Sequence, residues 1–415
     1  MATKRTRKQA VLFKVETVYG SDAGPTGGAN AMLVTNLQIV PMEGGTVSRD
    51  LVRPYLGNDQ QIPVNTHVSV SFDVEMSGSG VAGTPPAYGV MLRACGLAET
   101  AVTGLATIAN SPPVGVGTPA GSFTFVKTAA FTGTQPRDVT LTCTTAGGSG
   151  IAQFTVSAPA AGNLDAYNQA GVVMTDAAAF DLGGGAQITP TVTAPFQVGD
   201  EFTIALTAPR VEYDPVSDGF EAGTLYVNKD GNLHALLGSR GTVQMKLEAN
   251  QLPKWSFTFK GLWVDPSAAP LPSTDTSAFK APIAVSATNT PELTLHGISS
   301  PAQSLTINFD NQVEFFNRIA KEAMEIADRK PKGSIVIEDP GVDAKNYFLA
   351  AKSADMGALR LVHGIEPGGI VQVDGPQAQV FNPRYSDDRG VQMLTMDLSL
   401  VPTDAGDDEV KITVK

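Results

Sequence analysis

Residues 64–76 read VNTHVSVSFDVEM, in which apolar and polar side chains alternate from end to end. An extended strand places successive side chains on opposite faces, so this pattern predicts a half-buried β-strand. At about 3.3 Å per residue the strand would be roughly 43 Å long, far beyond the usual five or six residues. We therefore expect it to extend past its own domain, as part of a wall with one wet and one packed face. The residues assigned to the packed face are Val64, Val68, Val70, Phe72, Val74 and Met76.

A helix is predicted directly after this strand. Pro85 suits a first helical position, Tyr88, Met91 and Cys95 recur at helical spacing, and Gly96 can end the helix. Cys95 would then be a buried core thiol, because it lies on the apolar face of the helix.

The same succession of strand and helix occurs a second time, about 230 residues later. Residues 305–309 alternate like the first strand, and Asn311 with Glu314 forms a capping-box signature for a helix that runs to Lys330. The string RGTV at 240–243 resembles KGSIV at 332–336. We interpret the chain as a duplicated building block; the alternative is that two α+β domains share these patterns by chance.

The stretch 101–210 differs in composition from the rest of the chain. It holds few charged residues, whereas the whole chain has 17%. Its alternating runs are separated by glycine, proline, asparagine and aspartate at spacings typical of β-sandwiches. We predict an inserted Ig-like β-sandwich with strands at 123–126, 139–144, 151–156 and 202–207.

Two further segments connect the predicted elements. Residues 41–63 form a long connection rich in glycine and proline, and connections of this length are usually functional or disordered. The side chains in it that could anchor contacts with a neighbouring molecule are Arg49, Asp50, Arg53 and Tyr55. We expect an arm, with a mobile surface loop as the alternative, and we interpret 268–288 as a linker.

Composition excludes several classes of protein. With 415 residues, two or three domains are expected, and no apolar run approaches the roughly 18 residues of a membrane span. A net charge of −12 argues against a protein that grips nucleic acid. The four histidines stand apart, no signal peptide is visible, and two cysteines suit a reducing cytoplasm. We predict no catalytic, cofactor or metal site, and no enzyme.

The chain resembles the major tail tube proteins of long-tailed bacteriophages, especially siphophages. The likeness rests on a basic N-terminal segment leading into residues 8–11, the long loop 42–63, the strand 64–76 and the helix 85–96. The resemblance implies a structural virion protein, mainly β, whose sandwich domains each carry one helix. In this family the domains pack side by side into rings around an inner barrel, a long loop links stacked rings, and Ig-like modules decorate the outside.

The resemblance also implies a domain arrangement and partners. Residues 1–100 plus 211–267 would form a first tube domain, and 289–415 a second. Three chains would then make a pseudo-hexameric ring, with a hexamer of chains as the fallback. Implied partners are other copies, tail terminator and tail tip proteins, the tape measure protein and DNA in transit, after assembly in the host cytoplasm. The alternative functions are a phage fibre or adhesin and, less favoured, an enzyme on a β scaffold.

Overall fold

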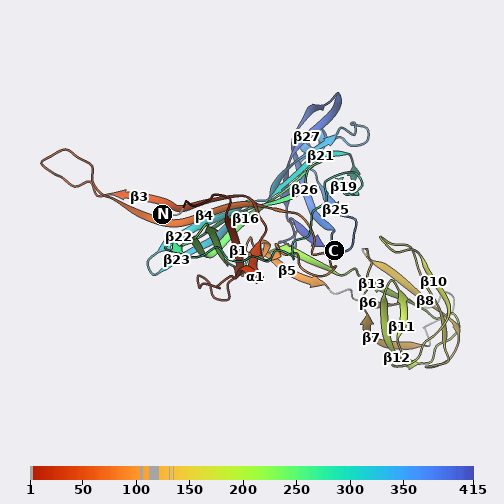
Figure 1. Cartoon of the computed structure of the whole chain (residues 1–415). Helices are drawn as coiled ribbons and strands as arrows, with labels where there is room; N and C mark the ends of the chain where they lie inside the picture. Colours follow the sequence, from red (N-terminus) through yellow and green to blue (C-terminus); the bar gives the residue numbers. More distant parts are fainter. Residues whose placement is uncertain (1–2, 103–105, 112–120, 130, 134) are drawn as a thin grey trace.

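The computed structural model describes residues 3–102, 106–111, 121–129, 131–133 and 135–415. Strands make up 55% of the structure and helices 4%, so the mainly β fold that the alternating patterns predict is confirmed. Figure 1 shows a main body from which a long hairpin projects on one side, with a separate sandwich at the opposite end.

The main body is organised around one antiparallel sheet that runs through both halves of the chain. In spatial order its strands are β3 (Thr35–Ser48), β4 (Gln61–Glu75), β17 (Lys254–Trp263), β16 (Asn232–Glu248), β21 (Ala302–Asn308), β24 (Lys332–Glu338), β27 (Val391–Val401) and β26 (Val371–Asp388). The two halves repeat the same order of strands. In the first half the hairpin β3–β4 is followed by β17 and then β16, and in the second half the pair β21–β24 is followed by β27 and then β26. The two halves therefore repeat one arrangement, joined where β16 pairs with β21.

The long strands β16 and β26 each bend away from this sheet at their N-terminal ends. There β16 pairs with β15 (Gly223–Lys229), and β26 pairs with β25 (Met356–His363). The main body also contains further strands: β1 (Gln9–Val15), β2 (Ala31–Met32), β5 (Leu97–Val102), β14 (Arg210–Pro215), β18 (Ser267–Ala268), β19 (Glu292–Leu295), β20 (Ile298–Ser299) and β28 (Lys411–Val414).

One hydrophobic core extends through both halves of the main body. Phe72 of β4 packs against both Phe257 and Phe259 of β17, with ring centroids 5.9 and 6.0 Å away. At the joint between the halves, Met245 lies opposite Ile307, and both are fully buried. Burial of each such side chain contributes about 1.5–3 kcal/mol, so the shared core holds the two halves together.

The helix predicted after the first strand is present but short. It is α2 (Gly89–Arg93), and Cys95 beyond it is buried as expected, which raises the pKa of its thiol. A four-residue helix, α1 (Gly27–Asn30), precedes β2.

The helix predicted from Asn311 is wrong. Those residues form a second hairpin, β22 (Asn311–Arg318) and β23 (Lys321–Arg329), which continues the β21–β24 pair. Because β21 and β24 are already antiparallel neighbours, the chain between them gains more by extending the ladder than by forming a helix. Met324 and Ile326 are buried with Val313 beside Phe220, whereas Ala320 and Ala327, two of the apolar residues at helical spacing, are exposed. The buried side chains therefore follow the alternation of a hairpin and not the stripe that suggested a helix.

The helix of the second half lies further on, at α3 (Tyr347–Ser353). Asn346 caps it by accepting a hydrogen bond from the Leu349 amide at 2.9 Å, and Ala354 ends it in the left-handed conformation. The expected match of 332–336 with 240–243 is also corrected. Residues 332–336 lie in β24, which occupies the place of β4, whereas 240–243 lie in β16.

The separate sandwich has its own core. One sheet has the order β10 (Tyr167–Val173), β9 (Gln153–Ala158), β8 (Arg137–Thr145), β13 (Glu201–Leu206) and β6 (Ala106–Ser111), and the other has β11 (Phe180–Gly183), β12 (Ala186–Ala194) and β7 (Ser122–Ala129). Phe154 meets Phe196 edge to face, with centroids 5.0 Å apart, and Phe202 packs beside them. All four strands predicted in this stretch are present, as β7, β8, β9 and β13.

Candidate assembly surfaces

The arm is a ladder of two strands rather than a loop. β3 and β4 stay paired out to Ser48 opposite Gln61, so only 49–60 of the predicted connection 41–63 lies beyond the strands. The ladder is the outer continuation of the sheet of the main body, and Figure 1 shows it projecting far beyond the other strands. A strand pair on a twisted sheet holds its tip in a defined direction, which a free loop would not do.

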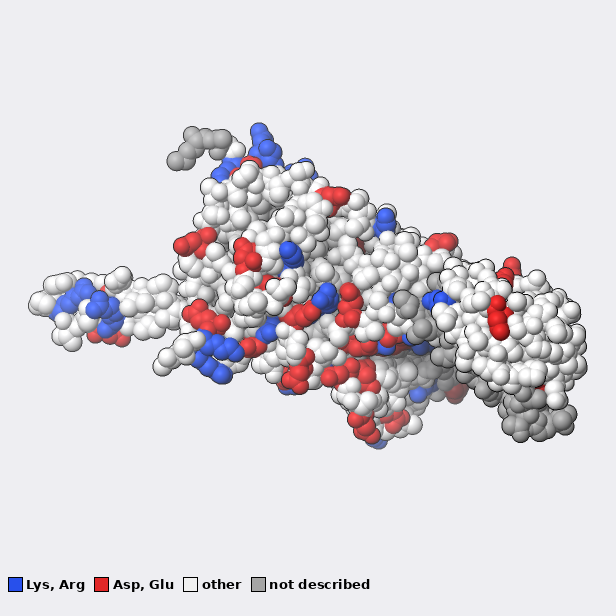
Figure 2. Space-filling model, turned by 90° about the horizontal axis from the view of Figure 1, so that it is seen from below, with Lys and Arg blue, Asp and Glu red and all other residues white. Residues whose placement is uncertain are grey.

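The polar residues predicted to anchor contacts lie together at the tip of this arm. The Arg53 guanidinium pairs with the Asp59 carboxylate at 2.6 Å and lies 5.8 Å from the centre of the Tyr55 ring. The Asp50 carboxylate accepts a hydrogen bond from the Ser48 hydroxyl at 2.6 Å. Figure 2 shows basic side chains gathered on the arm, whereas the surface of the sandwich has few charges.

The tip also presents the apolar side chains of Val52 and Leu56, which were not among the residues predicted to anchor contacts. Val52 and Leu56 are fully exposed, at 103% and 102%, and Tyr55 is 65% exposed. Apolar groups projected together into solvent on an arm are typical of an interaction surface. The available signal was the presence of these residues inside a segment otherwise rich in glycine, proline and asparagine.

The residues assigned to the packed face of the first strand lie in two environments. From Val68 to Met76 the apolar side chains are buried in the core, whereas Val64 is half-buried because it belongs to the arm. The pairing registers extend this face through both halves of the chain as a continuous row. That row consists of Val74, Trp255, Met245, Ile307, Gly333, Leu398 and Val380.

Residues that are polar with the exception of Phe381 form parallel rows on the other face of the same sheet. One row consists of Glu75, Lys254, Lys246, Thr306, Ser334, Asp397 and Phe381, and the next of Asp73, Ser256, Gln244, Asn308, Lys332, Ser399 and Gln379. Lysines and carboxylates balance in these two rows, although the whole chain carries a charge of −12. This face is therefore polar and close to neutral.

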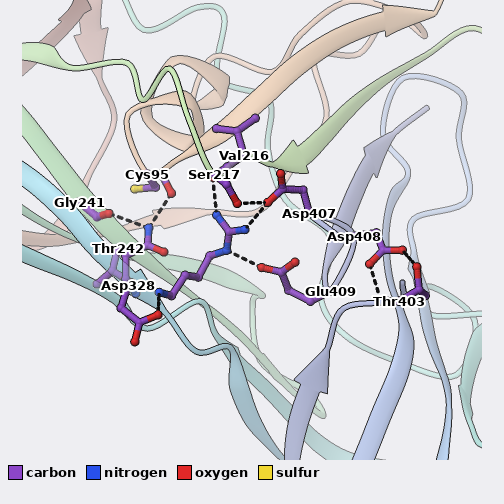
Figure 3. Close-up of polar contacts among 12 residues, drawn as sticks. Cys95, Val216, Ser217, Gly241, Thr242, Asp328, Thr403, Asp407, Asp408 and Glu409 are labelled. Carbon is purple, nitrogen blue, oxygen red and sulfur yellow. Dashed lines mark hydrogen bonds and ion pairs between the residues drawn. The ribbon is translucent and has the colours of Figure 1, made fainter. Parts of the chain in front are cut away.

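A first polar cluster ties β23 to the segments beside the paired strands β14 and β28. The Arg329 guanidinium donates to the Glu409 carboxylate, to the Val216 carbonyl at 2.8 Å and to the Asp407 carboxylate at 3.1 Å (Figure 3). The Arg329 and Glu409 side chains are only 11% and 6% exposed. We call this group the Arg329 clasp, because it joins segments from both halves of the chain.

A second cluster fixes the hairpin β22–β23 on the first half. The buried Arg240 guanidinium donates to the Met324 carbonyl at 2.7 Å and to the Phe220 carbonyl at 2.9 Å, and it pairs with the Glu325 carboxylate. The Tyr19 ring lies 5.1 Å from the same guanidinium. Burial raises the pKa of the Tyr19 hydroxyl, which accepts a hydrogen bond from the backbone amide of Met324.

Asn311 also joins the second half of the chain to the first through hydrogen bonds. Its buried side-chain amide donates to the carbonyls of Cys95 at 2.6 Å and Gly241 at 3.0 Å, while its backbone amide donates to the Thr242 hydroxyl (Figure 3). One side chain from the second half thus satisfies two carbonyls of the first.

The variant Asn311→Ala should be less stable by about 1–3 kcal/mol, because it leaves buried carbonyl groups without their donor. Thermal and urea unfolding followed by circular dichroism would measure this loss. Asn317→Ala, on the exposed part of the same strand, is the control and should change stability little. Equal stability of the two variants would contradict a structural role for the Asn311 amide.

The described residues offer little for other functions. Among them, no three histidine, cysteine, aspartate or glutamate side chains are grouped so that they could hold a metal ion. No helix in the described part of the chain is long and apolar enough to cross a membrane.

Together, the repeated sheet, the projecting arm and the polar clasps define a structural β protein with surfaces suited to assembly. The chain belongs to the phage tail tube protein family, whose model matches residues 6–400. It is thus a structural component of a phage tail. No curated protein matches the chain.

Proposed function

We propose that this protein is the subunit of the tail tube and polymerises into stacked rings that form a hollow conduit for phage DNA. The observation that carries the proposal is the continuous sheet of the main body, with rows of buried side chains on one face and rows of polar side chains on the other. Such a sheet can serve as a wall with a wet bore and a packed outer layer.

We further propose two tube domains per chain, 1–100 plus 211–267 and 289–415, joined through 268–288, with 101–210 as an external Ig-like domain. The repeated strand order and the placement of α2 and α3 after β4 and β24 support this division. Three chains would then supply six tube domains to a ring, as a pseudo-hexameric trimer. A hexamer of chains is the alternative stoichiometry.

The arm is proposed as the contact between rings. It extends well beyond the main body, and its tip carries Arg49, Asp50, Arg53 and Tyr55 beside exposed apolar side chains. An extended arm with an apolar tip could reach a neighbouring ring and bury there. Arg53 would bring both an ion pair and a ring contact to this interface.

The proposed partners at the ends and inside the tube are tail terminator and tail tip proteins, the tape measure protein and, transiently, DNA. Binding to DNA depends largely on neutralising phosphates with lysine and arginine. The polar face has lysines balanced by carboxylates, so it would neither hold phosphate tightly nor repel it strongly. A face of this kind would let DNA slide past.

Negative-stain electron microscopy of the purified protein tests this function. We expect rings or hollow rods with an axial channel at high protein concentration. The alternative, a phage fibre or adhesin built of sandwich modules, predicts thin filaments without a channel. Compact single particles at every concentration would overturn the tube proposal.

The separate sandwich should be removable without loss of the tube. Val102 of β5 lies directly opposite Arg210 of β14, so an Asn-Gly turn in place of 103–209 can close this hairpin. We expect rods of smaller outer diameter and unchanged bore by electron microscopy. The control is the same turn inserted after Gly297, in the tight β19–β20 turn, which should leave the rod diameter unchanged. Loss of rings in the shortened protein would show that the sandwich is integral to the wall.

A further inference from the structure

The two halves of the chain are joined where β16 pairs with β21, and the strands that correspond to these two, β26 and β3, stand at the two ends of the sheet. β16 uses one edge twice, first for β15 and then, from Gln244 to Glu248, for β21. β26 uses the corresponding edge for β25 only as far as Gln379. Within the described residues, the part of this edge from residue 380 onward has no strand beside it, and β3 pairs with no strand other than β4.

The pairing registers show which residues of the two halves are equivalent. In the first half Met245 lies opposite Trp255 of β17, and in the second Tyr385 lies opposite Leu394 of β27. Trp255 pairs with the last residue but one of β4, and Leu394 pairs with the last residue but one of β24. Trp255 and Leu394 therefore hold equivalent places in the two halves. Tyr385 is therefore the counterpart of Met245.

The same reasoning applies to the first strand of each half. Ile39 pairs with Val70 of β4, and Ile307 pairs with Gly333 of β24. Val70 and Gly333 both stand five positions before the ends of their strands, at Glu75 and Glu338. Ile39 is therefore the counterpart of Ile307, the residue that Met245 faces inside the chain.

Burial differs between these equivalent positions in the way that a missing neighbour predicts. Met245 and Ile307, inside the chain, are fully buried at 0% exposure. Their counterparts are not: Tyr385 is 57% exposed, and Ile39 is half-buried although it packs on the core. The Phe348 ring of α3 lies 5.3 Å from the Tyr385 ring and leaves more than half of this side chain exposed.

We propose that β26 of one copy pairs antiparallel with β3 of the next, in the register that joins β16 to β21 within the chain. Tyr385 then lies opposite Ile39 of the neighbouring copy, and Asp387 opposite its Leu37. The pairing covers the open edge of β26 and the inner part of the open edge of β3, and the contact of Tyr385 with Ile39 continues an apolar row from one copy to the next. Covering these edges also protects them from uncontrolled association. The proposal rests on the proposed ring and specifies its joint: three such joints close three copies into one sheet.

Disulfide crosslinking tests this joint. The double variant Ile39→Cys/Tyr385→Cys is oxidised after assembly and run on a non-reducing denaturing gel. We expect covalent dimers and trimers with a ladder that stops at a closed trimer, and only dimers when the two single variants are mixed. The native thiols Cys95 and Cys143 are buried, so their background should be low. The control Val47→Cys/Tyr385→Cys, with the first cysteine on the arm, should give little ladder.

The outcomes separate the joint from the function. Rods that form normally while the Ile39/Tyr385 pair gives no more crosslinking than the control overturn the joint and leave the tube in place. A ladder that continues to six copies supports the joint and replaces the trimer by a hexamer. Folded protein that forms neither rings nor rods, in the parent chain as well as in the variants, overturns the tube itself.

Discussion

Replacing residues 49–60 by an Asn-Gly turn is expected to abolish long rods while the protein stays folded and forms single rings. Ser48 and Gln61 are directly opposed at the end of the arm, so the turn can close the ladder without strain. The replacement removes the exposed Val52 and Leu56 together with the Arg53–Asp59 pair. Arg53 contacts Asp59 and Tyr55, which belong to the tip themselves, so the loss of these groups should cost the main body little stability.

The measurement is rod length by electron microscopy, together with sedimentation velocity to detect rings. The matched control exchanges Ile319 and Ala320 for Asn-Gly at the tip of the hairpin β22–β23, which also has a two-residue turn. That control should assemble like the parent protein. Rods of normal length from the shortened arm would contradict a role for the tip in contacts between rings.

Arg329→Ala is expected to destabilise the main body by about 3–5 kcal/mol, because it leaves the buried Glu409 carboxylate without its partner. The loss should appear as a large fall in the thermal unfolding midpoint and as failure to assemble at temperatures that the parent protein tolerates. Arg329 also donates to the Val216 carbonyl, so the variant loosens the attachment of β23 to the segments beside β14 and β28.

The control for this clasp is the adjacent Lys330→Ala. Lys330 pairs with Asp328 at 2.6 Å, but its side chain is 69% exposed, and solvent screens such a pair so that it contributes little to stability. The double variant Arg329→Ala/Glu409→Gln should recover part of the stability, since it no longer buries an unpaired charge. A Lys330 variant as damaging as Arg329→Ala, or no recovery in the double variant, would refute the clasp as a buried ion pair.

Sequence patterns predicted well those elements whose partners did not alter their local preference. The alternation in 64–76, in 305–309 and in the sandwich strands corresponds to observed strands. In 311–330, by contrast, apolar residues at helical spacing are compatible with two structures. The hairpin forms because β21 and β24 already hold its ends together and because Phe220 and Arg240 pack and bond against it. Nothing within the segment itself carries that information.

The candidate surfaces divide in the same way. The residues of the arm could be named from the sequence, since glycine, proline and charged residues mark a projecting segment even where its strands are not foreseen. The Arg329 clasp could not be predicted from the sequence, because Arg329 and Glu409 stand 80 residues apart. Neither could the equivalence of Tyr385 with Met245, which depends on counting partners across the sheet.

By itself, the sequence determined that this protein is built of strands, that one of them is unusually long, and that a stretch poor in charge stands apart. These properties follow from side-chain periodicity and composition, which act locally along the chain. Only the tertiary structure decided which strands are neighbours, and hence where two halves repeat, which charges are buried together and which edges remain open. Strand pairing is a non-local choice, made by the burial and hydrogen bonding of the whole sheet rather than by any one segment.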